Sequence, residues 1–211
     1  MAESAVMEPT IQTEQPRRIS PAAHLAGAFT AAEVTGPRGV RLRETPFLTM
    51  IGVRVVPDTA AAAGIEASLR FSLPAGCGAV TAAHNRSVLW LSPDEFLVIS
   101  DDDEPAEATA ALRTALGEQP GSVIDLSSNR TTFELSGPSA RAVLEKGCSL
   151  DLHPRTFTVG TAYVTLIGSV PVIVWRNGED SYRILPRSSF ADFLGRWLLD
   201  AMAEFKAPEV P

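Results

Sequence analysis

Few residues in this chain have the chemistry that catalysis requires. The 211 residues include two cysteines, Cys77 and Cys148, and three histidines, His24, His84 and His153. Cys148 and His153 are close enough in sequence for a turn to bring a thiol nucleophile to an imidazole base. The alternative is a buried structural thiol beside a loop histidine, and we favour it because free cysteines are usually buried and inert. His24 and His84 fall in predicted loops without an identifiable partner.

Two further groups of residues are candidates for chemistry, one around Asp125 and one at 101–104. Asp125 precedes Ser127 and Ser128 and could act as a general base, although an Asp-x-Ser turn is the commoner reason for such a composition. The acids of 101–104 precede a predicted helix. Because they are consecutive and lack the glycine pattern of a metal-binding loop, we expect them to stabilise the helix N-terminus. We therefore predict no catalytic, cofactor-binding or metal-binding residue in this chain.

Composition and missing motifs exclude further classes. The formal net charge is -7 and no basic patch is evident, which argues against binding to nucleic acid. No apolar run approaches the roughly 20 residues of a membrane span, and none suits a signal peptide. Glycine-rich phosphate loops, the serine elbow and the zinc helix motif are absent as well. We predict a cytoplasmic protein with reduced cysteines and no contact with a membrane.

The elements that must position these residues are short strands and helices. Strands are predicted within 40–56 and over 79–83, 87–92, 96–100, 121–126, 130–135, 163–167, 170–175 and 181–185. Helices are predicted after Asp58, over 105–116, after 136–138 and from 188 to about 205. The last is the clearest, because large apolar residues recur in it at helical spacing.

Local signals predict where several elements begin and turn. Thr45-Pro46 should separate two strands that pair with each other, and Asp58 should cap the helix that follows. The turn before the last strand should lie at 176–178. Ser188 or Ser189 should cap the final helix.

The order of elements repeats along the chain. Each half reads strand, helix, three strands, helix, and each final strand pair carries a tryptophan, Trp90 or Trp175. We predict an α+β fold of two similar halves, with an antiparallel or mixed sheet and helices on one face. The domain boundaries that follow are a flexible tail over 1–20, a single domain over 21–207 and a frayed end over 208–211.

Six stretches, in consistent order, match the pattern of one known family. They are 42–48 (LRETPFL), 89–97 (LWLSPDEFL), 125–131 (DLSSNRT), 134–144 (ELSGPSARAVL), 146–154 (KGCSLDLHP) and 187–194 (RSSFADFL). On these stretches the chain resembles the gamma subunits of heterotetrameric bacterial sarcosine oxidases. The resemblance covers nearly the whole body of the chain.

The resemblance implies a subunit of an oxidase complex. That complex demethylates sarcosine to glycine, reduces oxygen to hydrogen peroxide and can pass the one-carbon unit to tetrahydrofolate. The resemblance places NAD, FAD and FMN in the alpha and beta subunits and zinc in the delta subunit, and it places no cofactor in the gamma subunit. It implies that this chain has alpha, beta and delta partners, a structural role and no activity alone.

The resemblance also implies a fold like the folate-binding domain of aminomethyltransferases. Those relatives carry further domains that this chain lacks room for, so folate binding is not carried over. Two alternatives stay open, namely a free-standing folate-binding or aminomethyltransferase-like protein and a small hydrolase that uses Cys148 and His153.

Overall fold

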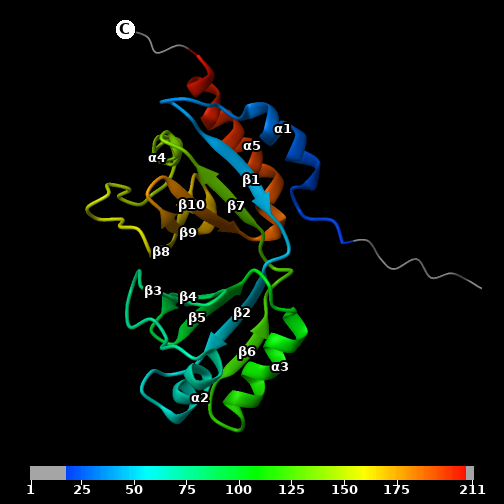
Figure 1. Cartoon of the computed structure of the whole chain (residues 1–211), viewed down its shortest axis with the longest axis vertical. Helices are drawn as coiled ribbons and strands as arrows, with labels where there is room; N and C mark the ends of the chain where they lie inside the picture. The colour runs from blue at the N-terminus through cyan, green and yellow to red at the C-terminus, as the bar shows by residue number, and fades with distance from the viewer. Residues whose placement is uncertain (1–17, 208–211) are drawn as a thin grey trace, which may run out of the picture.

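The computed structural model describes residues 18–207 and contains two five-stranded sheets with helices outside them. The predicted tail over 1–20, except for residues 18–20, and the predicted frayed end over 208–211 lie outside the described residues. Figure 1 shows the two sheets stacked, with α1 and α5 beside the upper sheet and α2 and α3 beside the lower one.

The lower sheet has the strand order β3-β4-β5-β2-β6, and every neighbouring pair is antiparallel. Its strands are β2 (Thr49–Arg54), β3 (Val80–Ala83), β4 (Arg86–Ser92), β5 (Glu95–Ser100) and β6 (Ser122–Asp125). Its outer face packs against α2 (Ala60–Leu69) and α3 (Pro105–Leu116). Alternate strand residues such as Val53, Val88 and Phe96 face those helices, as the two-residue period of a strand requires.

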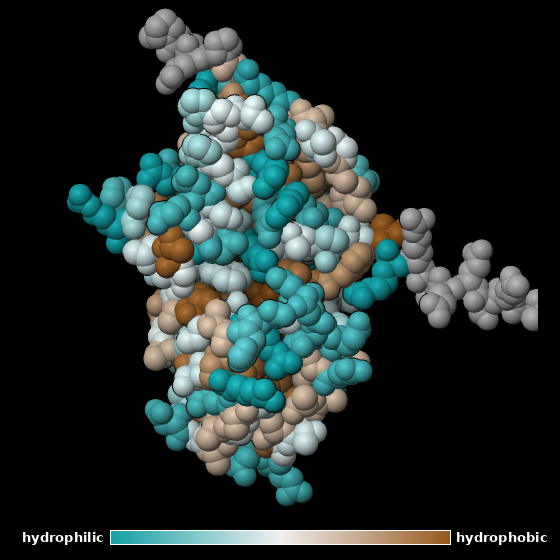
Figure 2. All heavy atoms as spheres, in the orientation of Figure 1, coloured by the Kyte–Doolittle hydropathy of each residue, from teal (hydrophilic) through white to brown (hydrophobic). Residues whose placement is uncertain are grey.

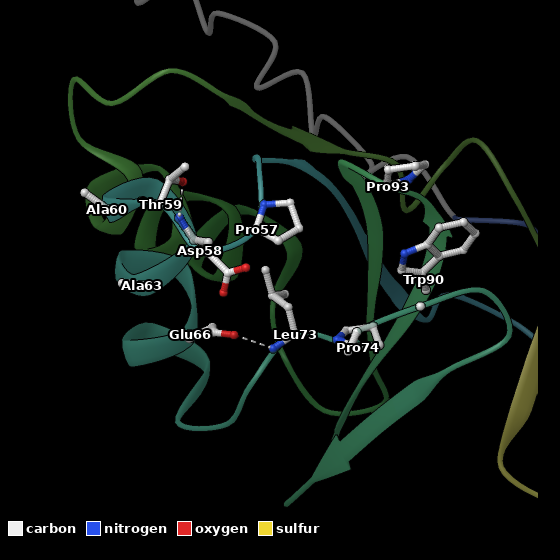
Figure 3. A pocket seen from close by; sticks show the side chains of 13 residues that line it. Pro57, Asp58, Thr59, Ala60, Ala63, Glu66, Leu73, Pro74, Trp90 and Pro93 are labelled. Carbon is white, nitrogen blue, oxygen red and sulfur yellow. Dashed lines mark hydrogen bonds between the residues drawn. The ribbon is translucent and has the colours of Figure 1, made fainter.

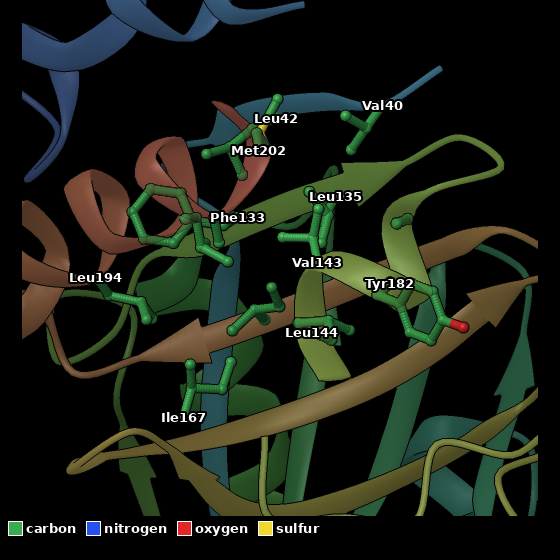
Figure 4. Packing of buried hydrophobic residues seen from close by; sticks show 14 of the residues in the cluster. Val40, Leu42, Phe133, Leu135, Val143, Leu144, Ile167, Tyr182, Leu194 and Met202 are labelled. Carbon is green, nitrogen blue, oxygen red and sulfur yellow. The ribbon is translucent and has the colours of Figure 1, made fainter. Parts of the chain in front are cut away.

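The upper sheet has the order β8-β9-β10-β7-β1 and is also antiparallel throughout. Its strands are β1 (Arg41–Thr45), β7 (Thr132–Ser136), β8 (Thr161–Ile167), β9 (Val170–Gly178) and β10 (Ser181–Pro186). The helices on its outer face are α1 (Ala26–Ala32), α4 (Ala140–Glu145) and α5 (Ala191–Met202). Figure 4 shows their packing, in which Leu194 and Met202 of α5 meet Phe133 of β7.

The inner faces of the two sheets pack on each other. Leu89, Leu97 and Ile99 of the lower sheet and Ile173 and Trp175 of the upper sheet share one buried cluster. The molecule is therefore layered as helices, sheet, sheet, helices. Each sheet is covered on both faces, which explains why so many strand residues are apolar. No helix within residues 18–207 is long and apolar enough to span a membrane.

The two halves have the same topology, and each half contributes one edge strand to the sheet of the other. The lower order β3-β4-β5-β2-β6 matches the upper order β8-β9-β10-β7-β1 position by position. The edge strand β1 precedes β2 in sequence but pairs with β7, and the edge strand β6 precedes β7 but pairs with β2. The predicted α+β fold with two similar halves is confirmed, and each half completes its sheet with a strand from the other.

The predicted pairing of strands around Thr45-Pro46 is wrong. β1 and β2 lie in different sheets, because β1 pairs with β7 while β2 pairs with β5 and β6. The burial patterns of the two strands explain why they do not pair. β1 is an edge strand with alternating burial, whereas β2 is central and almost continuously buried, so the two strands suit different environments.

Some predicted element ends are also wrong. Thr59 caps α2 and accepts a hydrogen bond from the N–H of Ala62 at 3.4 Å, while Asp58 precedes the cap with a φ of 60°. The 3-10 turn η2 (Ser188–Phe190) precedes α5, so neither Ser188 nor Ser189 caps it. β9 continues through 176–178, which moves the turn to 179–180.

The two tryptophans are not equivalent between the halves. Trp90 packs against the cluster on the helix side of the lower sheet, whereas Trp175 lies between the sheets. They are therefore not marks of the repeat, which is carried by the order of the strands.

Candidate functional site

Cys148 and His153 do not form a nucleophile–base pair. Burial raises the pKa of the Cys148 thiol, and contacts with the backbone of Leu150 and the hydroxyl of Thr165 only partly oppose this. His153 is exposed, and its Nδ1 accepts a hydrogen bond from the N–H of Arg155 at 3.2 Å. A thiol with a raised pKa holds less thiolate at neutral pH, so Cys148 has the properties of a structural residue.

Asp125 and Ser127 form a turn that joins the two sheets. The N–H of Ser127 donates to Asp125 Oδ1 at 2.8 Å, which is the geometry of an Asp-x-Ser turn. The hydroxyl of Ser127 in turn accepts from the N–H of Met50 at 3.0 Å. The turn interpretation is confirmed, and these groups hold the end of β6 against β2.

The acidic run 101–104 is occupied by ion pairs and hydrogen bonds. Glu104 is in the N-cap position of α3 but its side chain makes no capping hydrogen bond. The three aspartates each bind a side chain from another segment: Asp101 pairs with Arg183, Asp102 with Asn85 and Asp103 with Arg86. The acids precede α3 as predicted, but the aspartates bind residues of other segments and the N-cap residue makes no side-chain hydrogen bond. Within the described residues, no group of three or more acidic, histidine or cysteine side chains is placed to hold a metal.

The other two histidines have no catalytic partner in the described part of the chain. His24 Nε2 lies 2.6 Å from Asp192 Oδ1, which ties the 3-10 turn η1 (Ala23–Leu25) to the start of α5. The hydrogen bond to His24, followed by that to Arg196, lowers the pKa of Asp192. His84 lies in the turn between β3 and β4 and has a φ of 54°.

A cavity of about 840 Å³ opens beside the first turn of α2 (Figure 3). The carboxylates of Asp58 and Glu66 point into it, and Trp90 and Pro93 form the opposite wall. Glu66 Oε1 accepts a hydrogen bond from the N–H of Leu73 at 2.8 Å and so fixes the loop after α2. The hydroxyl of Thr59 in its lining donates to the carbonyl of Val56 at 2.6 Å, so it is not paired with a base. No sequence motif marked this cavity, because its lining comes from three separate segments, 57–66, 73–76 and 90–93.

Several large apolar side chains are exposed on the surface. Val164 and Leu166 project from the edge strand β8, at 58% and 42% exposure. Figure 2 shows hydrophobic surface at the boundary between the two sheets, where β8 and β3 meet. Other exposed large apolar residues are spread over several strands, helices and loops: Ile19, Phe47, Val56, Ile124, Val159, Phe190 and Phe193. Apolar residues scattered singly in this way are common on protein surfaces, whereas Val164 and Leu166 are two residues apart on one strand and face the same side.

Comparisons with known proteins match nearly the whole chain. A model described as sarcosine oxidase, gamma subunit family, matches residues 54–204. Sarcosine oxidase subunit gamma of Corynebacterium sp. (strain U-96) is 49% identical over 201 residues, which are 95% of this chain and 97% of that protein.

Solved structures agree with the sequence comparison. A chain of heterotetrameric sarcosine oxidase from Corynebacterium sp. U-96, in complex with pyrrole 2-carboxylate, has a TM-score of 0.88 at 49% identity. The match covers 92% of this chain and 99% of that chain. Glycine cleavage system aminomethyltransferase T from Bartonella henselae has a TM-score of 0.57 at 18% identity, over 83% of this chain and 48% of that one. That second likeness concerns the fold alone.

Proposed function

Since the chain belongs to the sarcosine oxidase gamma subunit family, we propose that it works as a subunit inside a heterotetrameric sarcosine oxidase. The observation that carries this proposal is the likeness to a chain of the Corynebacterium enzyme, at 49% identity over 92% of this chain. The likeness is not limited to one motif. Both sheets and the helices outside them are therefore preserved together, as a shared mode of assembly requires.

We further propose that its role in the complex is structural. Cys148 is not paired with His153, and Asp125 and Ser127 are used in a turn. The oxidation of sarcosine, with NAD, FAD, FMN, zinc and the transfer to tetrahydrofolate, then belongs to the alpha, beta and delta partners. Cytoplasmic location is part of the same proposal.

An omission experiment tests the proposal. The partner subunits are co-expressed with and without this chain, and sarcosine-dependent hydrogen peroxide release is measured together with the size of the complex. We expect omission to lower both, and addition of the chain to restore them. A full-size complex of unchanged activity without this chain would contradict the proposal. As a control, the double variant Cys148→Ala and His153→Ala should restore activity as well as the wild type does.

The alternative of a free-standing folate-binding protein has only the fold in its favour. The likeness to aminomethyltransferase T is at 18% identity, which carries no residue roles. Calorimetric titration of the isolated chain with tetrahydrofolate separates the two ideas. The subunit proposal expects no binding at micromolar concentrations, whereas saturable binding would favour the alternative.

A further inference from the structure

A small cavity with unpaired arginines lies where the chain crosses between the sheets. It has a volume of about 240 Å³, and Arg18, Phe47 and Arg130 are among the residues that line it. Arg187 lies beside Arg130 through an antiparallel backbone bridge. Among the ion pairs of residues 18–207, none involves Arg18, Arg130 or Arg187.

Arg130 is held in an unfavourable electrostatic setting. Burial lowers its pKa, the neighbouring charge of Arg187 lowers it further, and Glu95 opposes this only in part. Like charges placed opposite each other across a strand pair are destabilising. One Arg130 nitrogen, Nη1, donates to the carbonyl of Leu185 at 2.9 Å, which fixes the direction of the side chain. A carboxylate entering from outside would relieve this cost.

The neighbouring polar groups are already engaged, which leaves the arginines as the donors of the cavity. The hydroxyl of Ser188 donates to the carbonyl of Ser128 at 3.0 Å. The hydroxyl of Thr131 donates to Glu44, whose carboxylate also accepts from Ser20. Glu44 forms no ion pair with Arg18, Arg130 or Arg187 in the described residues.

Phe47 adds an exposed aromatic ring to the same surface. Its φ is 63°, a conformation in which a bulky side chain is strained, and it is 44% exposed. The Arg18 guanidinium lies 4.6 Å from the centre of its ring. Ile19, at 73% exposure, is the next residue along the chain. Strained backbone that holds an apolar ring in solvent is typical of a binding surface.

We infer that this surface docks an acidic segment of a partner subunit. We call it the Arg–Phe47 patch, made of Arg18, Ile19, Phe47, Arg130 and Arg187. A carboxylate of the partner binds the arginines, and a flanking apolar side chain packs on Phe47. The inference rests on the proposed function. Its basis is charge complementarity, because the patch is cationic on a chain of net charge -7 and no carboxylate within residues 18–207 forms an ion pair with its arginines.

The test uses the full chain captured by its tagged partner subunits. Phe47→Gly removes the ring and suits the positive φ, so we expect its thermal midpoint to be no lower than that of the wild type. Its capture should weaken at least about tenfold, as for a central interface residue. Arg18→Glu should weaken capture similarly by repelling the carboxylate, and this effect should shrink at high salt. The matched controls Arg155→Glu and Val56→Ala, both exposed and outside the patch, should bind like the wild type.

The outcomes separate this inference from the proposed function. Capture of the wild type and the controls, with loss in folded Phe47→Gly and Arg18→Glu, supports docking at the patch. Equal capture of all variants would overturn the inference and leave the subunit proposal standing. Failure of the wild type itself would overturn both. If patch variants bind normally but change the protease sensitivity of residues 1–17, the patch serves that segment of the chain and the inference is wrong.

Discussion

At the scale of single residues, the ion pair of Asp103 and Arg86 has the clearest consequence. Arg86 donates from Nε to Oδ2 at 2.5 Å and from Nη2 to Oδ1 at 2.9 Å. The hydrogen bond to Arg86 is the largest cause of a lowered pKa at Asp103, and Ser100 adds to it. Because the folded pKa lies below the unfolded value of about 3.9, this stabilisation is present above that pH. It is lost as the pH falls through the folded pKa.

In the variant Asp103→Asn, the free energy of unfolding should therefore fall less steeply as the pH is lowered. We expect the wild type to lose more stability than the variant between about pH 5 and pH 2, because only the wild type must protonate this carboxylate. Urea unfolding midpoints at successive pH values measure the difference. Asp180→Asn, an exposed carboxylate without an ion pair in the described residues, serves as the control. Parallel curves for Asp103→Asn and the wild type would refute this assignment.

At the scale of elements, α2 and α3 approach closely at Gly64. A Cβ added to Gly64 would clash with the carbonyl oxygen of Ala115 on α3, whereas one added to Gly27 on α1 meets nothing within 4 Å. Alanine normally favours a helix by up to about 1 kcal/mol over glycine.

Replacing glycine by alanine should thus affect the free energy of unfolding differently at the two sites. Gly64→Ala should lower the free energy of unfolding by about 1–3 kcal/mol, because the helices must separate. Gly27→Ala should leave it unchanged or raise it slightly. Thermal or urea unfolding of both variants checks this, and stabilisation by Gly64→Ala would show that the helices do not approach as described.

Helix α5 carries the strongest local signal in the sequence, and its inward face can be tested. Trp197 is partly buried and packs against Gly147, while Phe193 is 55% exposed. Trp197→Ala should cost about 3 kcal/mol, the lower end of the range for a buried tryptophan. Phe193→Ala, one turn earlier on the same side but more exposed, should cost much less. Equal unfolding midpoints for the two variants would contradict the packing of α5.

Local patterns predicted most elements but not how the strands pair. The apolar periodicity of α5 and the Pro93-Asp94 turn between β4 and β5 are short-range signals, and both elements form as predicted. The partner of β1 is β7, about 90 residues further along the chain. No signal within 40–56 points to a partner strand so far along the chain. The alternation of apolar and polar residues there therefore suggested that its two strands pair with each other.

At the scale of the whole molecule, the exchanged edge strands bind the halves together. β1 completes the upper sheet and β6 the lower one, so neither half has a complete sheet by itself. The single domain over 21–207 stays a prediction, and the exchange is the reason to expect that the two halves unfold together. A duplicated order of elements is visible in the sequence, but the exchange is not, because it depends on which strands meet in space.

The binding surfaces were equally invisible in the sequence. The Arg–Phe47 patch joins residues near positions 18, 47, 130 and 187, which no motif spans. The family motifs nevertheless include three of these positions, within 42–48, 125–131 and 187–194. The resemblance thus identified the family, whereas the geometry of the surface required the structure.

Purification of the tagged chain from its source cells shows whether the chain assembles into a sarcosine-oxidising complex. Native mass spectrometry gives the composition of the purified particle, and an absorbance scan reveals bound flavin. We predict a stable complex that contains larger, flavin-bearing chains and oxidises sarcosine. A colourless monomer, purified from cells that express the other subunits, would contradict the account.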